Sequence, residues 1–193
     1  RQYSRSPRRP GRARWAVATA LGVCETSTMT IVLIAALLYL IATAALVRAV
    51  GSDAPRPGRG WLAAAVPALL LHAGYHVQVA LQSAGGPDMH FFAALSLVGL
   101  GMAGLTSLVG ARGRMAALGV VVFPLAAVLL GAYHGYGHEP SKELGWRLAT
   151  HAWLALLSYA TLSIAALLAI MLWLQERTLR RREFRPWLRA LPP

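Results

Sequence analysis

The hydrophobic positions of the chain fall into five long runs, separated by short polar segments rich in Gly, Pro or Arg. The longest run extends from Leu148 to Gln175 and contains no formally charged residue. At a rise of about 1.5 Å per residue, these residues form a helix longer than the roughly 30 Å hydrocarbon core of a bilayer. The pattern predicts an all-α fold, a polytopic transmembrane helical bundle with spans at 31–48, 61–82, 91–110, 115–134 and 147–175.

Composition agrees with a membrane protein, since 56% of residues are hydrophobic, 13% are charged and the mean hydropathy is +0.51. The net charge of +12, taken alone, would be consistent with a protein that binds nucleic acid. The arginines, however, lie in tails and connections between apolar runs, where they determine topology and contact lipid headgroups. We therefore expect membrane lipids, and not nucleic acid, as partners. The single cysteine, Cys24, excludes an internal disulfide.

Basic residues beside spans mark the cytoplasmic side of a membrane. They are concentrated in the connections 51–60 and 111–114 and after residue 175, whereas the connections 83–90 and 132–146 are acidic or close to neutral. This predicts a multi-pass membrane protein, with the N-terminus of the first span on the outer side and the basic C-terminal segment in the cytoplasm.

Residues 1–28 contain six arginines and a weak apolar run that is too short, and lacks the cleavage pattern, for a typical signal peptide. A signal peptide remains an alternative. We interpret the segment as a disordered basic tail, or as sequence upstream of a true start at Met29 and so not part of the native protein. Residues 29–193 then form the membrane domain.

Two histidines, His72 and His76, lie inside the second span, one helical turn apart. An imidazole at this depth must be neutral, hydrogen-bonded or ligating. Neutral imidazole is a good ligand for iron, zinc or copper. The structural alternative is a hydrogen bond from His72 to a backbone carbonyl or to a serine on the next helix, and it is favoured for His76.

The other four histidines lie at the predicted outer boundary. His151 is in the first turns of the fifth span, close to Arg147 and to Trp146 and Trp153, which suit the membrane interface. We interpret His90, beside Phe91 and Phe92, as a cap on aromatic residues at the membrane interface. His134 and His138 are interpreted as solvated surface residues.

The spans contain no Asp or Glu, which argues against a proton-relay pump or a carboxylate-based cation transporter. No serine, cysteine or carboxylate arrangement indicates catalysis, and there is no phosphate-binding loop. The sequence thus favours a non-enzymatic role.

Five segments resemble, in spacing and order, the cytochrome c assembly protein family of haem-handling membrane proteins. They are LLLHAGYHVQ (69–78), HFFAALSLVGL (90–100), VVFPLAAVLL (121–130), THAWLALLSYATLSIAALLAIMLWLQERTLRRR (150–182) and the C-terminal RALPP. The resemblance covers residues 29–193 and is closest to the shorter bacterial inner-membrane branch, which lacks the tryptophan-rich motif. Members of that branch have more spans, so the chain looks like the N-terminal part of a longer fold.

The resemblance implies that haem is bound or moved at the outer side of the inner membrane, with other cytochrome c assembly proteins as partners. Relatives ligate haem through a histidine within a span and one at the outer end of a helix, which here correspond to His72 and His151. By this likeness both would hold haem iron, Arg147 would neutralise a propionate, and Trp146 and Trp153 would stack on the porphyrin.

Two alternatives stay open. The first is an accessory or scaffold subunit that associates through the small residues Gly99, Ala103 and Ser107 of the third span. The second is a divalent-metal transport-related protein that uses His134 and His138.

Overall fold

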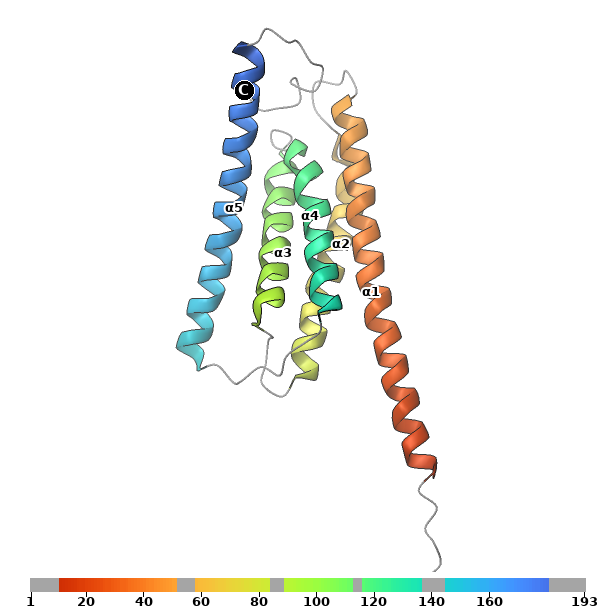
Figure 1. Ribbon diagram of the computed structural model, residues 1–193. Helices are drawn as coiled ribbons and strands as arrows, with labels where there is room; N and C mark the ends of the chain where they lie inside the picture. Colours follow the sequence, from red (N-terminus) through yellow and green to blue (C-terminus); the bar gives the residue numbers. More distant parts are fainter. Residues whose placement is uncertain (1–10, 52–57, 84–88, 113–115, 137–144, 181–193) are drawn as a thin grey trace, which may run out of the picture.

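The computed structural model describes residues 11–51, 58–83, 89–112, 116–136 and 145–180, and within these ranges it contains helices and no strands (Figure 1). This confirms the all-α prediction. In chain order the helices are α1 (Gly11–Gly51), the 3₁₀ turn η1 (Arg59–Trp61), α2 (Leu62–Gln82), α3 (Phe91–Gly110), the 3₁₀ turn η2 (Ala116–Leu118), α4 (Gly119–Gly135) and α5 (Trp146–Arg180).

Five stretches of the described residues are long and apolar enough to cross a membrane, in agreement with the predicted spans. They are Thr28–Ala49, Arg59–Gln82, Phe91–Gly110, Ala116–Gly135 and Trp146–Thr178. The predicted third span has the observed bounds, and the fourth differs by one residue at each end.

The prediction for residues 1–28 differs from the structure over its second part. Helix α1 does not begin near Met29 but continues back to Gly11, beyond the ends of the other helices (Figure 1). Once a helix is nucleated by the apolar span, each further residue adds a backbone hydrogen bond without a second nucleation step. Residues 1–10 lie outside the described residues, and a domain boundary at residue 29 stays a prediction.

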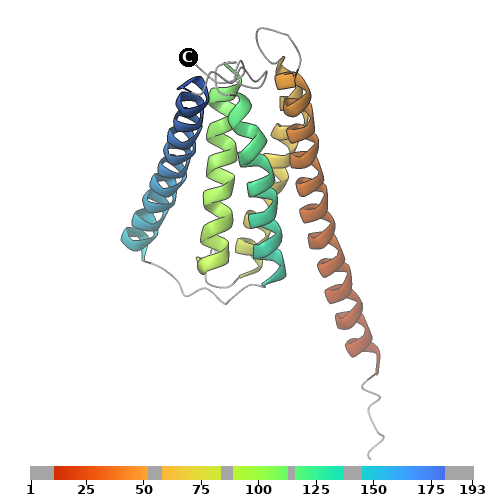
Figure 2. The same ribbon diagram turned by 45° about the horizontal axis from the view of Figure 1, so that its top comes forward.

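Helices α1 to α4 form a closed four-helix unit, in which α1 packs on α2 and α4, and α3 packs on α4 and α2. Helix α5 is attached to the outside of this unit and packs mainly against α3. In both ribbon views α3 lies between α4 and α5 (Figures 1 and 2).

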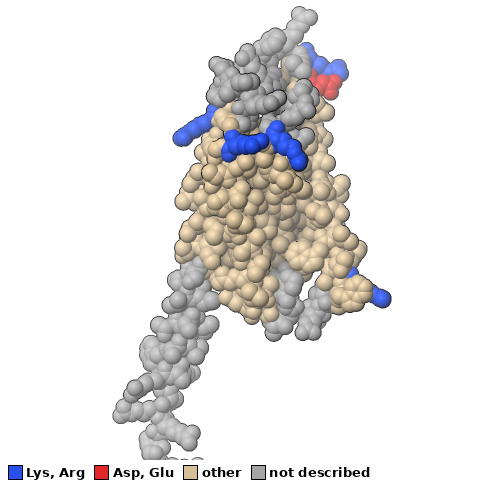
Figure 3. All heavy atoms as spheres, turned by 180° about the vertical axis from the view of Figure 1, so that it is seen from behind, with Lys and Arg blue, Asp and Glu red and all other residues tan. Residues whose placement is uncertain are grey.

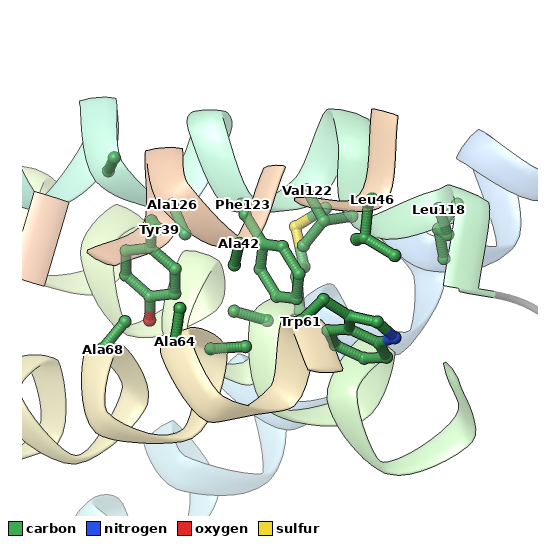
Figure 4. Packing of buried hydrophobic residues seen from close by; sticks show 14 of the residues in the cluster. Tyr39, Ala42, Leu46, Trp61, Ala64, Ala68, Leu118, Val122, Phe123 and Ala126 are labelled. Atoms are coloured by element: carbon green, nitrogen blue, oxygen red, sulfur yellow. The ribbon is translucent and has the colours of Figure 1, made fainter. Parts of the chain in front are cut away.

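The core of one half of the bundle is built on three aromatic rings. The ring of Phe123 stacks on Tyr39 at a centroid distance of 5.9 Å and lies 5.7 Å from Trp61 (Figure 4). Buried alanines such as Ala64 and Ala126 surround the rings and let the helices approach closely. In lipid, such dense packing replaces the hydrophobic effect as the main attraction between helices.

Two glycines of α3 lie where neighbouring helices leave little room for a side chain. A Cβ atom at Gly99 would lie 3.0 Å from Leu129 of α4, and one at Gly101 would lie 2.9 Å from the Cβ of Ala160 on α5. The predicted role of small residues in close packing is confirmed. Because Gly99, Ala103 and Ser107 are buried inside the bundle, the prediction of a scaffold surface on this face is wrong.

The described basic side chains gather at one end of the bundle, which we call the arginine-rich end (Figure 3). Arg147, at the start of α5, lies instead at the opposite end. The arginine-rich end comprises the end of α1, the start of η1, the turn after α3 and the end of α5, with Arg48, Arg59, Arg112, Arg177 and Arg180.

Candidate functional site

Helix α2 buries one face, and two side chains with polar groups, His72 and Tyr75, share it. Buried positions recur along this face at Ala68, His72, Tyr75 and Val79, with the spacing of one helical stripe. Since the hydrocarbon core supplies no bulk water, the polar groups of His72 and Tyr75 need hydrogen-bond partners within the bundle.

His72 is fully buried, and each of its ring nitrogens has such a partner. Its Nδ1 lies 3.2 Å from the hydroxyl of Tyr39 on α1, and its Nε2 lies 2.9 Å from Oγ of Ser96 on α3. His72 therefore joins three helices through its ring. The predicted alternative, a hydrogen bond to a serine on the next helix, is confirmed.

Ser96 also contacts the second histidine of the span. Its Oγ lies 3.0 Å from Nε2 of His76, so that one hydroxyl lies between two imidazoles. The two rings are themselves stacked, with centroids 5.5 Å apart. His76 continues the stack onto Tyr133 of α4, at 4.8 Å and an interplanar angle of 8°.

Tyr75 extends the polar contacts toward the end of the bundle that is poor in arginine. Its hydroxyl lies 2.9 Å from Nδ1 of His134 at the end of α4. His90, just before α3, lies 5.7 Å from the ring of Tyr133. We call the whole set the polar cluster: Tyr39, His72, Tyr75, His76, His90, Ser96, Tyr133 and His134.

The polar cluster is a satisfied network and does not form a metal centre. No group of three or more His, Cys, Asp or Glu in the described part of the chain is arranged to hold a metal ion. Nor does His72 offer a nitrogen to haem iron in this arrangement, since ligation would have to break the bond to Tyr39 or to Ser96. The transport alternative gains no support from His134, whose Nδ1 is paired, and His138 lies outside the described residues.

The other predicted site residues lie on the first turns of α5, away from the polar cluster. His151 is exposed and receives no hydrogen bond from the described residues, and Arg147 lies one turn before it. The guanidinium of Arg147 also lies 5.3 Å from the centre of the Trp146 ring. The structure thus does not bring His151 together with His72.

The two tryptophans occupy a different face of α5 from His151. At about 100° per residue, Trp153 and Trp146 project roughly 160° and 140° away from His151. Both tryptophans lie on the same side of α5 as Ala160, which is buried against the bundle. Their own side chains are nevertheless exposed, Trp146 to 74% and Trp153 to 46%. A porphyrin held by His151 on this helix would therefore not stack on them.

Sequence reasoning missed Tyr39, Tyr75, Ser96 and Tyr133. A signal was present, because each is a hydroxyl-bearing residue inside an apolar run, and such a group needs a partner within the bundle.

Comparison with protein families gives one match. The family model described as Cytochrome C assembly protein matches residues 61–193, which is more than half of the chain and includes α2 through α5. No curated protein and no solved structure matches the chain significantly.

Proposed function

The chain belongs to the cytochrome c assembly protein family, and on this premise we propose that it binds haem at the periplasmic side of the bacterial inner membrane. The family and the five apolar helices together support a role for this chain as a multi-pass membrane protein in cytochrome c biogenesis. The ligand, its site and the orientation of the chain are our proposals.

The exposed imidazole of His151 is the observation that carries the proposal. It is near the outer end of α5, no described residue pairs with it, and neutral imidazole is the usual axial ligand of haem. Arg147 lies about 40° from it around the helix, in reach of the same ligand, and would pair with a propionate. Leu148 and Leu154 flank His151 at about 60° on either side, and both are exposed. The imidazole, the guanidinium and the apolar side chains therefore match the iron, a propionate and the porphyrin ring of haem, respectively.

His72 takes a supporting role in this proposal. Its paired nitrogens hold α1, α2 and α3 together, so we assign it to the architecture of the bundle and keep iron ligation for His151. We assign Trp146 and Trp153 to the lipid interface, where exposed indoles are common.

The orientation follows from charge. The arginine-rich end would be cytoplasmic by the positive-inside rule, which places His151 and the His134 end of the polar cluster toward the periplasm. Other cytochrome c assembly proteins are the expected partners on that side.

The test is haem titration of the purified chain in lipid nanodiscs, followed by Soret absorbance. His151→Ala should weaken haem binding by about tenfold or more, and added imidazole should restore part of it. His72→Phe is the matched control, and it should leave the affinity unchanged if the variant stays folded. Haem affinity unchanged in His151→Ala, or lost only in His72→Phe, would overturn the assignment.

A further inference from the structure

A partly open cavity lies between α3, η2 and α5, remote from the polar cluster. Its volume is about 160 Å³, close to that of engineered cavities that accept benzene. Most of the wall is aliphatic, and two threonines complete it. The lining residues are Leu105, Thr106, Val109, Leu118, Thr161 and Ile164.

Thr106 is unusual in this lining. It is only 1% exposed, and its Oγ1 is the buried side-chain polar atom of the described residues that has no hydrogen-bond partner. Two neighbouring hydroxyls, by contrast, bond a carbonyl of their own helix: Ser107 to Ala103 at 2.8 Å, and Thr161 to Ser158 at 2.8 Å. A hydroxyl left unpaired next to a cavity indicates that the ligand of the cavity supplies the partner.

The position of Thr106 restricts the chemistry of that ligand. Thr106 precedes the end of α3 at Gly110 by four residues, or about 6 Å, so it lies near the border of the hydrocarbon. Water is a poor candidate, because an ordered water needs two to four polar partners and the wall offers almost none. An apolar chain with one hydrogen-bond acceptor near the membrane border fits the wall, the hydroxyl and the depth.

Cations lie beside the same end of α3. Arg112 follows Val109 of the cavity wall by three residues and is exposed, and Nε of Arg59 donates to the carbonyl oxygen of Ala111 at 3.1 Å. An anionic group just outside the hydrocarbon would meet these two guanidinium groups.

We propose that the cavity binds a diacyl phospholipid from the leaflet at the arginine-rich end. The first methylenes of one acyl chain fill the apolar cavity, the ester carbonyl of that chain accepts a hydrogen bond from Thr106 Oγ1, and the phosphate lies toward Arg112 and Arg59. This site is independent of haem and of the residues proposed to bind it.

The experiment compares two phosphatidylglycerols that differ only in the linkage of their chains, diacyl ester and dialkyl ether, by native mass spectrometry of the purified chain. The headgroup contribution cancels, and the ether lipid lacks the carbonyl. Wild type should prefer the ester lipid by about fivefold, the factor expected of one ordinary hydrogen bond. Thr106→Val should bind both lipids equally, whereas Thr161→Val, at the same cavity, should keep the preference.

Absence of an ester preference in the wild-type chain would overturn the proposal without any variant. A preference that persists in Thr106→Val, or that Thr161→Val abolishes equally, would overturn it as well.

Discussion

Replacing Ser96 by alanine removes the hydroxyl that lies between His72 and His76. The change deletes two hydrogen bonds, of 2.9 and 3.0 Å, and it leaves the Nε2 atoms of both rings without this partner. His72 is fully buried, so water cannot replace the lost partner there. Ser96→Ala should therefore lower the free energy of unfolding by more than the removal of one surface hydrogen bond would.

The magnitude follows from two bounds. Interhelical hydrogen bonds in membrane proteins average about 0.6 kcal/mol, so two such bonds give a lower bound of about 1 kcal/mol. A buried polar atom left unpaired costs about 1–3 kcal/mol, which sets the upper bound. We expect Ser96→Ala to lower the free energy of unfolding by about 1–3 kcal/mol.

The assay is reversible unfolding in mixed detergent micelles, with Ser107→Ala as the matched control. Ser107 is also a buried serine of α3, but its hydroxyl bonds only the carbonyl of Ala103 in its own helix. Its replacement should change the free energy of unfolding by less than about 0.5 kcal/mol, because such back-bonding contributes little to a helix. Equal losses in the two variants would refute the assignment of Ser96 as the polar link between α2 and α3.

The remaining predictions use the same unfolding assay. Gly101→Ala should destabilise the chain by about 1–3 kcal/mol, since its Cβ would lie 2.9 Å from that of Ala160, and Ala160→Gly in the same chain should restore most of the loss. Gly131→Ala meets no atom within 4 Å, so it should be neutral or stabilising by up to about 1 kcal/mol, and a loss would show that the contacts of α4 differ from those described. Tyr39→Phe keeps the stack on Phe123 but leaves Nδ1 of the buried His72 without its 3.2 Å partner, so it should cost about 1 kcal/mol or more, yet less than Ser96→Ala, which removes two bonds. A cost larger than that of Ser96→Ala would mean that Tyr39 is the principal anchor of His72.

The extent of the helices could be predicted from the sequence because lipid imposes one dominant constraint. An apolar run must be about as long as the hydrocarbon is thick, which is why the third span at 91–110 is observed with the predicted bounds. Hydropathy does not decide where a helix stops in water, and the continuation of α1 back to Gly11 was therefore missed.

The partners of His72 could be predicted only in part. Its depth in the second span required a hydrogen bond, and a serine on the next helix was among the expected partners. The choice of Ser96, and the contact with Tyr39 that is 33 positions away in the chain, depend on how far each helix is rotated about its axis. Rotation is determined by packing, for example by the close approach at Gly99, and not by hydropathy.

The position of Ser96 also couples the protons of its two neighbours. A hydroxyl carries one proton, so it can donate to the Nε2 of one ring while it accepts from the Nε2 of the other. In the arrangement that pairs every atom, His72 and His76 hence carry opposite tautomers, and the direction of the Tyr39 bond follows from the choice. Reversing the polarity of the Tyr39–His72–Ser96–His76 chain requires the Ser96 hydroxyl to rotate and both imidazoles to exchange tautomers, so this buried link has two distinct proton arrangements.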